Sequence, residues 1–93
     1  MTLLEFWPDY GPGPLWTEAG QPADLAALGV DSALVVEASA WNAEYGESKV
    51  PIEGPGDEAW LTKGRDLLVR LRSALGPDYQ VVVTEPWWGE DPM

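Results

Sequence analysis

Residues 57–84 read DEAWLTKGRDLLVRLRSALGPDYQVVVT, and this stretch decides the fold. Asp57 is a natural N-cap, and apolar side chains then recur at helical spacing as far as Leu75. Gly76 and Pro77 end the pattern firmly, so the sequence predicts a long amphipathic helix. The residues expected on its buried stripe are Trp60, Gly64, Leu67, Leu68, Leu71 and Leu75.

Strands are expected near both ends of the chain. Tyr79–Thr84, which follows the helix, is rich in residues that favour strands, and the pattern stops before Pro86. Thr2–Trp7 alternates loosely between two faces until Pro8 ends it. Leu15–Glu18 is expected to return beside this first strand as the second arm of a hairpin.

A second helix is expected between these strands. Asp31 is its natural N-cap and Gly46 supplies the stop. At spacings of four, three and four, the recurring apolar residues are Leu34, Ala38, Trp41 and Tyr45. A strand over Leu34–Val36 is the competing interpretation, but the apolar spacing continues well beyond the length of a typical strand. Residues 20–29 are expected to form a short helix or a wound connection, and residues 46–56 a linker.

These elements predict one small α+β domain over residues 1–93. Two main helices are expected to pack on a short two- or three-stranded sheet, which gives a domain of two layers. The first and last strands are joined through helices, and such a connection allows them to run parallel. Their carboxyl ends then meet at one edge of the sheet.

The composition excludes several kinds of chemistry. The 93 residues contain neither cysteine nor histidine, so disulfides, zinc sites of the usual kind, cysteine nucleophiles and imidazole bases are excluded. The sequence has no calcium-loop motif, phosphate-binding glycine loop or serine elbow. We therefore expect no catalytic residues, no metal site and no cofactor, and we do not expect an enzyme.

Charge is distributed unevenly along the chain. The 16 acidic and five basic residues give a formal net charge of −11, and residues 1–48 contain no lysine or arginine. Such a field repels nucleic acids and anionic membranes, and it attracts a basic protein partner. The chain starts without a signal-peptide pattern and has no aliphatic run that could span a bilayer, so a cytoplasmic location is expected.

The six tryptophans fall into two groups. Trp41 and Trp60 lie on the apolar stripes of the two helices and are expected in the core. Gly64 weakens the helix that contains it, so it is expected to mark a close contact rather than a site. The others lie at strand ends or in loops beside carboxylates, and they are Trp7, Trp16, Trp87 and Trp88.

This second group predicts a protein-binding surface. Rigid aromatic rings bury a large contact area against a partner, and the surrounding carboxylates pair with Lys or Arg of a basic partner. In the alternative, Trp87 and Trp88 fold back to plug the open end of a small core. The expected partner-binding residues are Trp7, Asp9, Tyr10, Trp16, Glu85, Trp87, Trp88, Glu90 and Asp91.

Several motifs resemble those of small acidic bacterial proteins, commonest in actinobacteria, to which no activity is assigned. These motifs are Trp7–Gly11, Pro14–Trp16, Ala40–Tyr45, Trp60–Leu68 and Leu75–Tyr79. The resemblance covers nearly the whole chain and implies a domain that stands alone. In size, acidity and exposed aromatic residues, the chain is also loosely similar to immunity proteins that neutralise bacterial toxins.

The leading hypothesis is a non-catalytic immunity or antitoxin protein that masks a basic bacterial toxin. A structural or homodimeric interaction domain is the main alternative, although a charge of −11 on each copy opposes self-association at low salt. Sugar binding or glycoside hydrolysis is a further alternative because aromatic rings stack on sugars and paired carboxylates divide acid and base roles. Nothing in the spacing of the carboxylates selects this chemistry.

Overall fold

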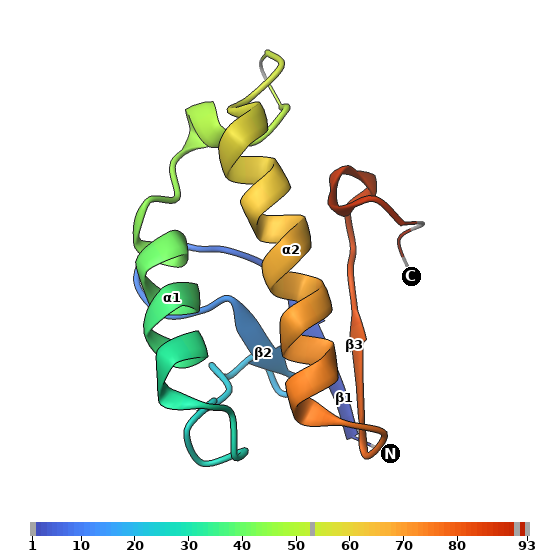
Figure 1. The fold of residues 1–93 in the computed structure, drawn as a ribbon. Helices are drawn as coiled ribbons and strands as arrows, with labels where there is room; N and C mark the ends of the chain where they lie inside the picture. Colours follow the sequence, from blue (N-terminus) through green and yellow to red (C-terminus); the bar gives the residue numbers. More distant parts are fainter. Residues whose placement is uncertain (1, 53, 91, 93) are drawn as a thin grey trace.

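The computed structural model describes residues 2–52, 54–90 and 92, and it confirms the predicted α+β class. Two helices lie on one side of a three-stranded sheet (Figure 1). In chain order, the elements are β1 (Thr2–Phe6), β2 (Leu15–Thr17), α1 (Ser32–Ala43), the 3-10 turn η1 (Glu47–Lys49), α2 (Glu58–Leu75), β3 (Tyr79–Val82) and the 3-10 turn η2 (Pro86–Trp88).

The sheet has the order β2-β1-β3, so the first strand is central. β1 pairs antiparallel with β2, which confirms the hairpin, and it pairs parallel with β3, the direction that the helical connection allowed. The register places Glu5 between Trp16 of β2 and Val82 of β3. Side chains alternate between the faces of a strand, so these three residues point to the same face.

Both helices begin where the sequence predicts. The Asp31 carboxylate accepts a hydrogen bond from the backbone of Ala33, and the Asp57 carboxylate accepts one from the backbone of Trp60. These bonds satisfy backbone donors that the first turn of a helix leaves free. Residues 20–29 form the wound connection, with turns in place of a regular helix, and the expected linker contains η1.

The core lies between the helices and the inner face of the sheet, and Trp41 and Trp60 join the two helices there. Their rings stack with centroids 4.3 Å apart. The Trp41 Nε1 donates to the Trp60 carbonyl at 2.9 Å, and the Trp60 Nε1 donates to the Trp41 carbonyl at 3.1 Å. The prediction that both rings are buried is confirmed, and each polar nitrogen has the partner that burial demands.

Gly64 is the point of closest approach in this core. A Cβ at this position would meet the Trp41 ring, and it would lie 2.8 Å from Cζ3 of Trp88. Real Cβ atoms do not approach carbon so closely, so the predicted close contact is confirmed.

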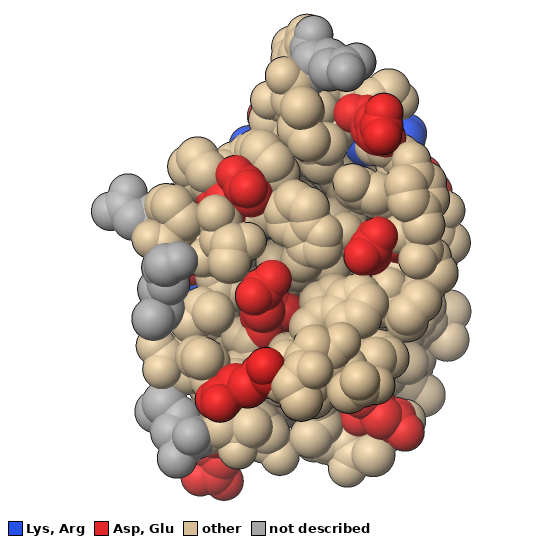
Figure 2. Space-filling view, turned by 180° about the vertical axis from the view of Figure 1, so that it is seen from behind, with Lys and Arg blue, Asp and Glu red and all other residues tan. Residues whose placement is uncertain are grey.

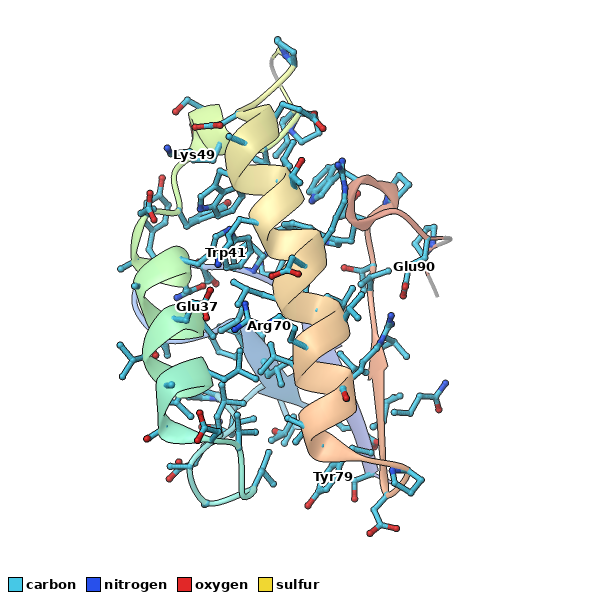
Figure 3. All side chains as sticks on the ribbon, viewed as in Figure 1. Glu37, Trp41, Lys49, Arg70, Tyr79 and Glu90 are labelled. Atoms are coloured by element: carbon cyan, nitrogen blue, oxygen red, sulfur yellow. The ribbon has the colours of Figure 1, made fainter. Side chains whose placement is uncertain are left out.

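Glu37 links the two helices through charge, and it lies between them beside Arg70 (Figure 3). Arg70 binds its carboxylate with two hydrogen bonds of 2.9 and 2.5 Å, and Lys63 donates a further one. Arg70 also pairs with Asp66 at 3.0 Å, the i,i+4 pair expected from the sequence. The hydrogen bonds from Arg70 and then Lys63 lower the pKa of Glu37 from 4.5 to about 2.

Replacement of this carboxylate gives a stability change that depends on pH. A lowered pKa means that Glu37 stabilises the folded state above about pH 4.5 and loses this effect as the pH falls toward about 2. We expect Glu37→Gln to lower the urea midpoint at pH 7, with a difference from the parent that narrows steadily below pH 4.5. Glu58→Gln is the matched control, because its pair with Arg65 is largely exposed and contributes little. A difference that is constant with pH would contradict this role.

Candidate functional site

The face of the sheet that the helices leave uncovered contains a groove. Leu4 and Phe6 of β1 point into the core, so the residues that alternate with them face the other way. The groove has a volume of about 360 Å³. We call it the sheet-face groove and define it by six of its lining residues, which are Glu5, Trp7, Asp9, Trp16, Glu18 and Val82.

The two indoles of the sheet-face groove are held in place. The Trp16 Nε1 donates a hydrogen bond of 2.8 Å to the backbone carbonyl of Trp7. The Trp7 ring packs against Trp87, with ring centroids 5.9 Å apart. Both walls are therefore formed before any ligand arrives, which reduces the entropy that binding costs.

A buried asparagine on α1 shapes the end of the groove. Asn42 is 2% exposed, and its Oδ1 accepts a hydrogen bond of 3.0 Å from the backbone N–H of Asp9. Its Nδ2 donates to the carbonyl oxygens of Asp9 and Gly11 at 3.2 and 2.9 Å. Asn42 thus fastens the loop that follows β1 to the helix layer. This role was not expected from the sequence, although a polar residue directly after a buried tryptophan was a signal for it.

Removal of this amide is expected to destabilise the domain. Asn42→Ala deprives one backbone N–H and two carbonyl groups of their partner, so we expect the free energy of unfolding to fall by about 1 to 3 kcal/mol. Ser39→Ala, at an exposed position of the same helix, is the control. Equal urea midpoints for Asn42→Ala and the parent would show that the hydrogen bonds of Asn42 do not stabilise this loop.

In the loop that Asn42 fastens, Tyr10 is 65% exposed. Its ring packs edge to face against Tyr45, with ring centroids 4.9 Å apart. Partial burial raises the pKa of Tyr45, and the acidic groups of Tyr10, Asp9 and Glu47 raise it further. This end of the molecule therefore continues the acidic and aromatic character of the sheet-face groove.

All five basic residues of the chain are already in ion pairs. Lys49 pairs with Asp57, Lys63 and Arg70 with Glu37, Arg65 with Glu58, and Arg72 with Glu90. Within the described part of the chain, Glu5, Asp9 and Glu18 form no ion pair. Figure 2 views the molecule from the side opposite Figure 1 and shows separate carboxylates on a largely uncharged surface, with only small areas of blue.

The chain is similar to one family of known proteins. The family model described as Serratia CdiI immunity protein-like matches residues 2–86. The chain belongs to this CdiI-like family. No curated protein and no solved structure matches it. The matched residues include the whole sheet-face groove and end just before Trp87.

In this CdiI-like domain, the two adjacent tryptophans of η2 lie in different surroundings. Trp88 is 3% exposed and packs edge to face against Phe6, with ring centroids 5.1 Å apart. The alternative in which one of these rings closes the core therefore holds for Trp88. Trp87 is partly buried and supports Trp7 from outside the core. The indole nitrogens of both rings are buried, and neither has a hydrogen-bond partner among the residues that the structure describes.

The remaining expected site residues are spread around this CdiI-like fold. Glu90 is engaged by Arg72 through hydrogen bonds of 2.5 and 2.7 Å, which lower the pKa of its carboxyl group. Arg72 also donates to the carbonyl oxygen of Val81, so the pair fastens the C-terminal segment beside β3. Glu85 is partly exposed and has no ion pair in the described chain. Asp91 lies outside the described residues.

The structure brings Trp7, Asp9 and Trp16, three of the expected partner-binding residues, together in one groove. It adds Glu5 and Glu18, which were not among the residues expected from the sequence. The signal for Glu5 was present, because it alternates with Leu4 and Phe6 and so shares a face with Trp7. No helix among the described residues has the length and apolar character needed to cross a membrane.

Proposed function

We propose that this CdiI-like chain is an immunity protein that binds a basic toxin domain through the sheet-face groove and masks it without catalysis. The observation that carries the proposal is the charge of the groove. Three carboxylates and two indoles line it, and it contains no lysine or arginine. Membership of an immunity protein-like family supports a toxin as the class of partner. The expected place of this encounter is the cytoplasm.

The composition of the groove matches what binding requires. Tryptophan is among the residues that contribute most to protein interfaces because a rigid ring buries a large area at little cost in entropy. Carboxylates around such an anchor speed the encounter with a basic surface and disfavour acidic partners. Tyr10, Glu85 and Trp87 would extend this surface around the groove, whereas Trp88 is buried in the core and Glu90 is paired with Arg72.

If the proposal holds, the reading frame immediately upstream of this chain's gene is expected to encode a toxin domain, and the test is protection of cells from that domain. We expect the parent to restore growth and to copurify with that domain, and Glu5→Lys to do neither. Asp78→Lys makes the same charge change at an exposed position away from the groove and is expected to protect fully. Equal protection by all three proteins would show that the toxin binds elsewhere, and no protection by the parent would refute the proposal.

The homodimer alternative has its own test. A binding protein for a foreign partner is expected to sediment as a monomer at both low and high salt. A homodimer with −11 on each copy would associate more strongly as salt screens the repulsion. Sedimentation velocity at two salt concentrations distinguishes these outcomes, and a mass that doubles at high salt would favour the dimer.

A further inference from the structure

Glu5 is an unusual residue for the centre of a sheet. It lies on the central strand, between Trp16 and Val82 in the register, and it is partly buried. Glutamate is depleted in strands because its side chain fits poorly on a pleated, half-buried surface. Its carboxylate forms no hydrogen bond or ion pair with any described residue, unlike that of Glu37, which binds two cations. The Glu5 carboxylate can therefore pair with a cation that comes from another molecule.

From this position we infer that the sheet-face groove receives one arginine side chain of the partner protein. This inference rests on the proposed function and deepens it. The guanidinium group pairs with the Glu5 carboxylate and stacks on the indole of Trp16 or Trp7. Asp9 and Glu18 line the same groove and add negative potential around the incoming cation.

The chemistry of the walls favours arginine over lysine. A guanidinium is planar, donates two parallel hydrogen bonds to one carboxylate, and stacks on aromatic faces. It is also more weakly hydrated than an ammonium, so it loses less on entering a site with apolar walls. Cations over a tryptophan face gain further energy from the ring. The groove volume of about 360 Å³ is at the lower end of the range for ligand pockets, which suits one long side chain.

The chain itself supplies no cation to this place. All of its lysines and arginines are engaged with other carboxylates, and four of them fasten α1 or the C-terminal segment to α2. The groove therefore presents a preformed site for a positive group that comes from another molecule.

The inference can be tested on the isolated protein with three short peptides, acetyl-Gly-Arg-Gly-amide and its lysine and citrulline counterparts. Citrulline keeps the shape of arginine and lacks the charge. Indole N–H signals would be followed by NMR at about 150 mM salt, where weak surface attraction is screened. We expect the arginine peptide to shift the signals of Trp7 and Trp16, the lysine peptide to bind at least about fivefold more weakly, and the citrulline peptide to leave the signals unchanged.

Two variants make the result specific. Glu5→Gln keeps the size of the side chain and is expected to weaken binding of the arginine peptide by about tenfold. Asp78→Asn, away from the groove, is expected to bind like the parent. Equal binding of arginine and lysine peptides, binding that survives Glu5→Gln, or no shift with arginine would each overturn the inference.

These results separate the inference from the proposed function. Toxin protection that requires Glu5, combined with no response to the arginine peptide, would leave the function standing and remove the arginine site. A clear response to the arginine peptide in a protein that gives no protection would keep the arginine site and refute the proposed immunity function.

Discussion

Trp88→Ala is expected to lower the free energy of unfolding by about 3 to 5 kcal/mol. The ring is almost fully buried between Phe6, Trp41 and Gly64, where its removal would leave a large cavity. Rigid neighbours fill such a cavity only in part, so the lost contacts are not replaced. Urea midpoints followed by far-UV circular dichroism give the measurement.

Two further variants show whether packing is the cause. Trp88→Phe keeps an aromatic ring and removes a buried indole N–H that has no partner, so it is expected to be less harmful than Trp88→Ala. Val69→Ala, at a position of α2 that is 65% exposed, serves as the control and should have little effect. An alanine variant that unfolds at the same urea concentration as the parent would place Trp88 outside the core.

Trp7→Ala is expected to weaken binding of the cognate toxin by about 2 kcal/mol or more, a loss of about thirtyfold in affinity. Trp7 forms one wall of the sheet-face groove, and its carbonyl oxygen accepts the hydrogen bond that orients Trp16. Loss of the ring removes apolar contact area from the interface and leaves the charge of the groove unchanged. The effect should therefore appear mainly in the dissociation rate, measured by surface plasmon resonance with the immobilised toxin domain.

Charge reversal in the same groove should change a different rate. Glu5→Lys is expected to slow association, and the difference from the parent should shrink as salt rises. Trp7→Phe should recover part of the affinity lost in Trp7→Ala, which would separate a binding defect from a folding defect. Unchanged affinity in Trp7→Ala, with a native circular dichroism spectrum, would exclude the groove as the main contact.

The candidate site was predictable only in part. Trp7, Asp9 and Trp16 were expected to bind a partner, and they meet in one groove because β1 and β2 form a hairpin. Glu90 was expected beside them, but its carboxylate pairs with Arg72 on α2. A charge alone does not show which of several opposite charges will reach it, since that depends on how the chain segments pack.

The sequence by itself determined where the helices and strands lie along the chain. Caps such as Asp31 and Asp57 and stops such as Gly76 act within a few residues, so local pattern is enough to place them. The helices between β1 and β3 allowed these two strands to pair parallel, and the structure shows that they do. These features depend on interactions along the chain or on its connectivity.

Only the tertiary structure decided which of two adjacent tryptophans is buried. Trp87 and Trp88 have the same side chain and the same local surroundings in sequence. Trp88 enters the core because Gly64, far away in the sequence, leaves space against α2. Glu5 likewise became a candidate site residue only when Trp16 and Val82 were placed on either side of it. The fit of a ring or the isolation of a charge is set by atoms from distant segments, and no local pattern records it.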